Sequence, residues 1–290
     1  MNVPTPGTVL AALGIDGGTA VLPVSGGMSG ALLWRVVRHE PGTDLLLRLL
    51  PHSGLATVEH EAAAQRSAHD AGIPTPRIDH VGVVAGCPVI LMTWLSGQTM
   101  LDVLVEQPSR SNALGQASGR LLRRIHDVAP VIGPANSYLG SRLAGVDRWL
   151  SRIVTASQDP TALIHVDFHP GNLIVGGDGT IAVLDWTNAS AGDPLIDLGR
   201  TFACLQLGAA LYANTIGRES IDAWWRGLIE GYSAANRTID ELAPFIAFGL
   251  VTLVDDCKVT SPNARVASGA VQDLVVQRDS WLSLARGVLP

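Results

Sequence analysis

Short apolar runs, each bounded by glycine, proline or charged residues, dominate the first third of the chain and predict β-strands there. The runs cover residues 21–24, 32–38, 44–50 and 88–94. Between the third and fourth runs, residues 58–71 are rich in alanine and contain no helix breaker. Gly72 and Pro74 follow directly, as is common where a helix stops. This part of the chain is therefore predicted to be a small sheet with one helix.

The pattern changes after residue 97, where apolar residues recur at helical spacing. The helical runs cover residues 114–125, 221–232 and 271–281. Strand and turn signals over residues 162–186 interrupt them. We therefore predict an α+β protein with a small β-rich part at residues 1–95 and a larger, mainly helical part at residues 96–290. The junction falls at residues 93–97.

Composition narrows the class of protein. The chain has 290 residues, of which 47% are hydrophobic and 16% are charged. Such a chain is not intrinsically disordered and can bury a large core. The longest apolar runs, residues 88–95 and 245–254, are too short to cross a bilayer. The formal net charge of −6 argues against a nucleic-acid partner.

Three further counts bear on location and chemistry. Residues 1–15 contain no lysine or arginine, so we expect no secretory or transit leader. The three cysteines, Cys87, Cys204 and Cys257, have no CxxC spacing, and we expect buried, reduced thiols in a cytoplasmic protein. The only lysine is Lys258, so a cationic site elsewhere has to use arginine.

One segment carries recognisable chemistry. His165, Asp167 and Asn172 form the pattern H-x-D-x-x-x-x-N, which is the spacing of a kinase catalytic loop. Two short apolar runs follow, at residues 173–175 and 180–184, on either side of a glycine-rich turn. This pattern predicts a β-hairpin, which would return the chain so that Asp185 lies close to Asn172.

These residue types suit phosphoryl transfer, which depends on positioning and on neutralisation of charge. Asp167 would hold an acceptor hydroxyl in line with the γ-phosphate and accept its proton. Asn172 and Asp185 would supply oxygen ligands to magnesium, which prefers them. His165 would keep the loop in shape, and Asp197 would brace it.

On the 165–172 loop, the Leu-Asp-Trp at 184–186 and the Gly-Asp-Pro at 192–194, the sequence resembles the aminoglycoside phosphotransferase family, small-molecule relatives of the protein kinases. The resemblance implies a bilobal protein-kinase-like fold and an enzyme that uses ATP, or GTP, with magnesium. Its acceptor would be a hydroxyl on a small molecule, such as an aminoglycoside- or macrolide-type antibiotic or a related metabolite. It would act in the cytoplasm as a monomer or homodimer, with no nucleic-acid or membrane partner, and could confer antibiotic resistance.

The resemblance also assigns residues around the nucleotide. The phosphates would lie under the glycine-rich stretch that includes Ser25, Gly26, Gly27 and Ser29. The hinge backbone near Thr93 and Leu95 would bind the adenine. Arg48 stands where the family has a lysine, and we expect it to contact the phosphates and to pair with Glu61 in preference to Glu59. Segments 121–126 and 231–232 resemble family helices around the acceptor pocket.

Some readings stay open at this stage. Val166 stands where many relatives have glycine, and we expect little chemical consequence. A metal-dependent hydrolase could use His165, Asp167, His169 and Asp185 as its ligands. A third interpretation is a nucleotide-binding pseudokinase, which would be inactive because the lysine is missing.

Several other residues are expected to have structural roles only. Trp224, Trp225, Cys204 and Cys257 are expected in the core. Asp255 and Asp256 are expected to be a solvated pair at a helix end.

Overall fold

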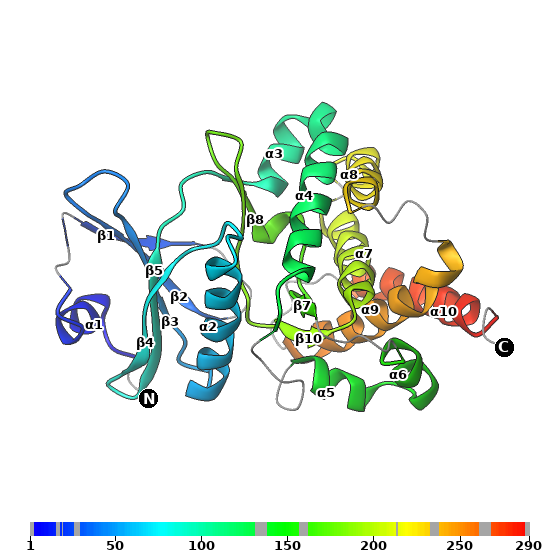
Figure 1. The fold of residues 1–290 in the computed structure, drawn as a ribbon, viewed down its shortest axis with the longest axis horizontal. Helices are drawn as coiled ribbons and strands as arrows, with labels where there is room; N and C mark the ends of the chain where they lie inside the picture. Colours follow the sequence, from blue (N-terminus) through cyan, green and yellow to red (C-terminus); the bar gives the residue numbers. More distant parts are fainter. Residues whose placement is uncertain are drawn as a thin grey trace.

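The structure is a computed structural model. It describes residues 3–15, 18, 20–25, 30–130, 138–156, 162–212, 214–232, 238–260 and 268–287. A β-rich lobe, at the left in Figure 1, adjoins a larger lobe that is mainly helical. The predicted bilobal α+β fold is confirmed.

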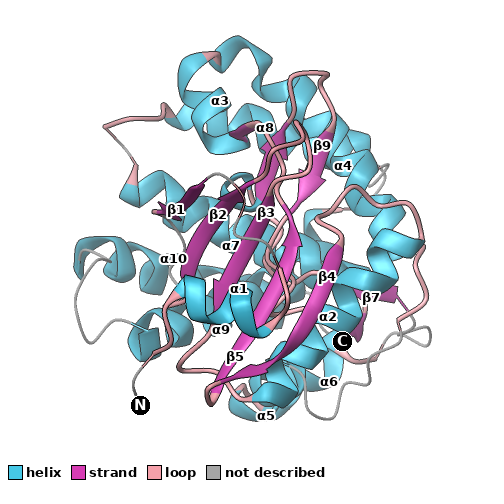
Figure 2. Cartoon of the chain, turned by 90° about the vertical axis from the view of Figure 1, so that its left-hand side faces the viewer, coloured by secondary structure: helices cyan, strands magenta, loops and turns pink. Residues whose placement is uncertain are grey.

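The smaller lobe is built on a five-stranded antiparallel sheet in the order β1-β2-β3-β5-β4 (Figure 2). Its strands are β1 (Ala20–Val24), β2 (Leu32–Val37), β3 (Leu45–Leu49), β4 (Ile78–Val84) and β5 (Cys87–Thr93). Four of them were predicted. The sequence pattern missed β4, because Asp79, His80 and Gly82 interrupt its apolar residues and the register shifts between Ile78 and His80.

One helix covers each face of this sheet. α1 (Pro6–Ala12) packs against one face, where Leu45, Leu47 and Leu49 are buried. α2 (Leu55–Asp70), the predicted helix, packs against the other face and lies between the sheet and the helical lobe (Figure 1). Because side chains alternate along a strand, Arg48 points to the α2 side while its neighbours point to α1.

Among its described residues, the larger lobe contains the three predicted helices and five more. The helices are α3 (Met100–Glu106), α4 (Ser111–His126), α5 (Tyr138–Gly145), α6 (Arg148–Val154), α7 (Pro194–Leu211), α8 (Arg218–Gly231), α9 (Ile239–Thr260) and α10 (Ser268–Gly287). Short 3₁₀ turns lie at Pro108–Arg110 and Pro170–Asn172. Trp224 is fully buried, as expected, and Trp225 packs against Phe202.

Two small sheets hold the chemical segment between these helices. β6 (Gln98–Thr99), β8 (Leu173–Val175) and β9 (Ile181–Val183) form one, and β7 (Ala162–Ile164) pairs with β10 (Ser190–Gly192) in the other. The β8–β9 pair is the predicted hairpin, with Leu173 opposite Val183.

The structure also tests the expectation that Asp255 and Asp256 form a solvated pair at a helix end. Asp256 is not a solvated helix-end residue, because its carboxylate forms ion pairs with Arg142 and Arg200 behind the catalytic loop. Asp255 does lie at the surface, paired with Lys258. Among the described residues, no helix is long and apolar enough to cross a membrane.

Candidate active site

The loop that follows β7 is held in place by Asp197 and Arg200, two side chains from the first turns of α7. The Asp197 carboxylate accepts the backbone N–H groups of His165 at 2.8 Å and Val166 at 2.5 Å. Arg200 donates to the Val166 carbonyl at 3.2 Å. Val166 has φ of +66°, a left-handed conformation that a β-branched residue rarely adopts. Its backbone, held on both sides, fixes the direction in which Asp167 leaves the loop.

His165 is fully buried, and both of its ring nitrogens make polar contacts that hold this loop. Its Nε2 lies 3.0 Å from the Leu184 carbonyl, and its Nδ1 accepts the Asp167 amide at 3.3 Å. Burial lowers the pKa of His165, so the imidazole is neutral. With both nitrogens engaged it cannot bind a metal, and the described residues include no group of three His, Cys, Asp or Glu side chains placed to do so. This arrangement does not favour the metal-dependent hydrolase.

The Asp167 carboxylate is 27% exposed and lies among hydrogen-bonding neighbours. The Asn172 amide donates to its Oδ2 at 3.0 Å, His169 Nε2 lies 3.6 Å from Oδ1, and the Cys204 thiol lies 3.6 Å from Oδ1. Burial acts to raise the pKa of Asp167, but His169, Arg200, His165 and the hydrogen bond from Asn172 together outweigh it and hold that pKa below its usual value. The carboxylate is therefore ionised at neutral pH.

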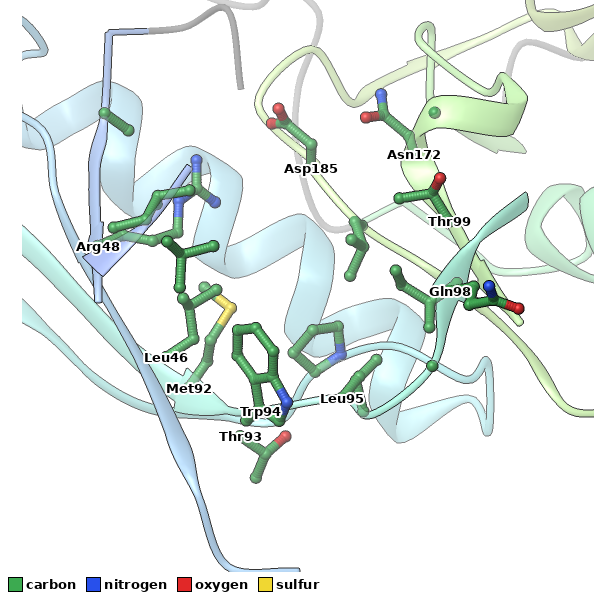
Figure 3. A pocket seen from close by; sticks show the side chains of 18 of the residues that line it. Leu46, Arg48, Met92, Thr93, Trp94, Leu95, Gln98, Thr99, Asn172 and Asp185 are labelled. Atoms are coloured by element: carbon green, nitrogen blue, oxygen red, sulfur yellow. The ribbon is translucent and has the colours of Figure 1, made fainter. Parts of the chain in front are cut away.

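The hairpin brings Asn172 and Asp185 together, since the Leu184 amide donates to the Asn172 carbonyl at 2.9 Å. Both side chains lie on one wall of a cavity, and Figure 3 shows the Asn172 side-chain oxygen on the side facing Asp185. The Asn172 –NH₂ group is already used by Asp167, so the amide oxygen is the atom left for a cation. One amide oxygen and one carboxylate form a donor set that fits magnesium.

Arg48 and Glu61 form a buried ion pair on the opposite side of this cavity. Glu59, the alternative partner, is exposed. The second oxygen of Glu61 lies 3.0 Å from the Thr187 hydroxyl, which also lies 2.6 Å from Asp185 Oδ1. Burial raises the pKa of Glu61, and the Arg48 charge acts in the opposite sense. The Arg48–Glu61 pair is thus linked to Asp185 through Thr187, a residue that the sequence analysis did not single out.

This cavity, of about 470 Å³, runs from the catalytic loop to the hinge between the lobes (Figure 3). The predicted residues that line it are Ser25, Arg48, Thr93, Leu95, Asn172 and Asp185. Gly26, Gly27 and Ser29 lie outside the described residues.

The hinge backbone offers fewer donors than expected. The Thr93 amide donates to the Arg77 carbonyl at 2.9 Å, and the Trp94 amide donates to the Asp44 carbonyl at 2.8 Å. Leu95 has no backbone hydrogen bond within the described part of the chain. The Leu95 amide is therefore available as a donor, whereas the Thr93 amide is already engaged.

A second cavity, of about 180 Å³, is lined by Asp167 and lies between α3, α7, α8 and α9. Gly171 lines both cavities, so the loop separates them. Cys204 also lines the second cavity beside Asp167, which corrects the expectation that it is a core residue; Cys257 is buried as expected. We call this space the acceptor cavity.

The helix segments 121–126 and 231–232 do not line the acceptor cavity, contrary to expectation. Instead His126 lies behind the catalytic loop, with Nε2 2.9 Å from Asp197 and Nδ1 2.7 Å from the Tyr232 hydroxyl. Burial raises the pKa of Tyr232 to about 12, so this hydroxyl keeps its proton. Sequence analysis missed the support that these two side chains give to Asp197, because only the fold brings them together.

Comparison with known proteins adds independent findings. A sequence model described as the phosphotransferase enzyme family matches residues 20–151 and 135–245. No curated protein sequence matches the chain at a significant level. Among solved structures, the ethanolamine kinase of Plasmodium vivax is 13% identical with a TM-score of 0.63, over 91% of this chain and 83% of its own.

Two further structures share the fold over most of both chains. A thermostable mutant of aminoglycoside phosphotransferase APH(4)-Ia, in complex with AMP-PNP and hygromycin B, is 14% identical with a TM-score of 0.60 and covers 97% of each chain. The choline kinase LicA of Streptococcus pneumoniae is 12% identical with a TM-score of 0.59, over 95% of this chain and 96% of its own.

Proposed function

The chain belongs to the phosphotransferase enzyme family, and we propose that it transfers the γ-phosphate of ATP to a hydroxyl group of a small molecule. The observation that carries the proposal is the position of Asp167, which lines one cavity and accepts a hydrogen bond from Asn172, a residue that lines the neighbouring cavity together with Asp185 and Arg48. Because Gly171 lines both cavities, they adjoin, and an acceptor hydroxyl held by Asp167 would lie next to a phosphoryl donor in the first cavity.

In this proposal each residue has one task. Asp167 orients the acceptor hydroxyl and receives its proton. Asn172 and Asp185 hold magnesium, which when bound neutralises charge on the phosphates. Arg48 contacts the phosphates as a permanent cation that can bind bidentately, with Glu61 holding its guanidinium.

The remaining nucleotide contacts come from the hinge and the loop after β1. Ser25, with the neighbouring Gly26, Gly27 and Ser29, covers the phosphates, and the backbone near Thr93 and Leu95 binds the base. Residues 1–95 then form the nucleotide-binding lobe, and residues 96–290 form the catalytic and acceptor-binding lobe. GTP in place of ATP, a cytoplasmic location, the monomer or homodimer state, an antibiotic as acceptor and a resulting resistance all stay predictions.

The ordered loop also argues against an inactive pseudokinase. His165, Asp197 and Arg200 all act to fix the backbone from which Asp167 projects. Arg48 has the buried carboxylate partner that a phosphate-binding cation needs for orientation, so the absence of a lysine does not leave the site without a positive charge.

Thermal unfolding with magnesium and ATP, GTP or ADP tests the proposal. A nucleotide at about 100 times its Kd stabilises the native state by about 2.7 kcal/mol, so the midpoint should rise by several degrees. The rise should require magnesium and should disappear in Asp185→Ala. It should persist in Asp178→Ala, a matched change in the exposed turn of the same hairpin. A wild-type protein with no magnesium-dependent rise would contradict the proposal.

A further inference from the structure

The acceptor cavity is lined mainly by apolar side chains. They include Leu104, Leu205, Leu207, Leu211, Ile216 and Leu253. Of the described residues that line it, Asp167 alone carries a formal negative charge, and none is lysine or arginine. The polar groups converge at one end, where Asp167, His169 and Cys204 meet the catalytic loop.

This lining does not suit a molecule that carries several positive charges. An ammonium group that enters an apolar cavity loses its hydration, and only an ion pair or several hydrogen bonds compensate for that loss. Asp167 is the one carboxylate available, and Asn172 and His169 already lie against it.

A quaternary ammonium group is equally poorly matched to the lining of this cavity. Such groups are recognised by several aromatic faces arranged as a cage. Among the described lining residues, Tyr212 supplies the one phenyl, phenol or indole ring, and it is 44% exposed. Cys204 adds no charge, because burial raises the pKa of its thiol and keeps it protonated.

We propose that the acceptor is a small uncharged alcohol with an apolar body, which fills the leucine-lined part of the acceptor cavity and presents its hydroxyl to Asp167. The inference rests on the phosphotransferase activity proposed above and narrows its acceptor. With a volume of about 180 Å³, the cavity has room for a small apolar body.

The reaction balances with ATP as the donor. The alcohol oxygen forms a bond to the γ-phosphorus, while the bond from that phosphorus to the β–γ bridging oxygen breaks and ADP leaves. The hydroxyl proton passes to the Asp167 carboxylate and from there to solvent. The product is a phosphate monoester.

The first test compares acceptors with the full-length wild-type chain, magnesium and ATP. Cyclohexanol and benzyl alcohol represent the uncharged apolar class, choline the monocationic class and kanamycin the polycationic class. ADP release is measured together with formation of the phosphate monoester. We expect kcat/KM for an apolar alcohol to exceed that for choline and kanamycin by at least about tenfold, which corresponds to about 1.4 kcal/mol.

A pair of variants tests whether this cavity is responsible. Leu211→Asp puts a charge into the partly buried lining and should raise KM for the apolar alcohol about tenfold or more. Leu284→Asp makes the same change at an exposed position of α10, outside the cavity, and should leave KM unchanged. Both variants should keep the magnesium–ATP rise in the unfolding midpoint.

The outcomes separate the two proposals. A preference for choline or kanamycin, or phosphorylation of none of these alcohols by a protein that still binds magnesium–ATP, would overturn the apolar acceptor and leave the nucleotide site standing. Equal KM values in Leu211→Asp and Leu284→Asp would also overturn it. Absence of the magnesium–ATP rise in wild type would instead remove the phosphotransferase proposal itself.

Discussion

At the scale of single residues, the neighbours of Asp167 decide its chemistry. His169 and Arg200 lower the pKa of this carboxyl against the effect of burial. A carboxylate with a depressed pKa is a weak base, so its main contribution is to orient the hydroxyl and to take up the proton late in the transfer. Because the pKa is lowered, the ionised form persists until the pH falls below the usual aspartate value of about 3.9.

The first prediction follows from that charge. Asp167→Asn keeps the shape but removes the acceptor for the proton, so kcat should fall by about 10²- to 10⁴-fold. The rise in unfolding midpoint with magnesium–ATP should remain as in wild type. In wild type, the plot of kcat against pH should show no loss of activity from Asp167 between pH 5 and 7. An acid limb in that range that vanishes in Asp167→Asn would contradict the assignment.

The second prediction concerns the ion pair in the smaller lobe. Arg48→Met leaves the Glu61 carboxylate buried without its cation, which should lower the free energy of unfolding by about 3–5 kcal/mol. Arg48→Met combined with Glu61→Gln removes both charges and should recover part of that loss. Urea unfolding of the two single variants and the double variant measures the coupling. Strictly additive losses would show that the two side chains do not interact.

The residues that sequence analysis identified differ from those it missed in one physical respect. His165, Asp167, Asn172 and Asp185 lie within one short segment, and a local hairpin is enough to bring them together. His126 contacts Asp197 from α4, and Tyr232, at the end of α8, contacts His126 in turn. No sequence spacing indicates contacts between such distant segments. The same holds for Cys204, which was expected in the core, although the fold brings it to Asp167.

At the scale of elements, glycine determines how closely α4 and α8 approach. Gly115 and Gly119 of α4 face the backbone of α8, and Gly227 and Gly231 of α8 face the backbone of α4. A Cβ atom at Gly119 would lie 2.1 Å from the Leu228 carbonyl oxygen. Helical periodicity predicted both helices, but glycine within a helix indicates only lower stability when the partner helix is not known.

The third prediction tests that contact. Gly119→Ala cannot be accommodated unless the two helices move apart, so we expect a loss of stability of about 1–3 kcal/mol despite the better helix propensity of alanine. Gly208→Ala in α7 is the matched control, since a Cβ there meets no atom within 4 Å, and it should leave stability unchanged or raise it by about 0.4–1 kcal/mol. Thermal unfolding measures both. Equal midpoints for the two variants would disprove the close packing of α4 on α8.

At the scale of the whole molecule, the region after Asp185 ties the two lobes together. His60 of α2 lies 2.7 Å from the Ala189 carbonyl, and the Trp186 indole donates to Thr75 at 2.9 Å. Thr187 lies between Glu61 of the smaller lobe and Asp185 of the larger one. Bilobal architecture was predictable from the change in periodicity along the chain. These links were not, because each joins residues more than a hundred positions apart.

The fourth prediction uses the hydroxyl of Thr187, whose single proton can serve only one of its two carboxylate neighbours at a time. Thr187→Val removes that donor. Asp185 then loses a hydrogen bond that orients it, and Glu61 keeps its ion pair with Arg48 but loses the contact with Thr187. We expect the Kd for magnesium–ATP to rise about tenfold, equivalent to about 1.4 kcal/mol, in isothermal titration.

Two control variants test whether the hydroxyl is responsible. Thr187→Ser retains the hydroxyl and should restore most of the affinity. Thr180→Val, which removes a hydroxyl at the exposed turn of the β8–β9 hairpin, should bind like wild type. If Thr187→Val and Thr180→Val bind magnesium–ATP equally well, the hydroxyl has no part in joining the Arg48–Glu61 pair to Asp185, and the lobes must be coupled through the contacts of His60 and Thr75 instead.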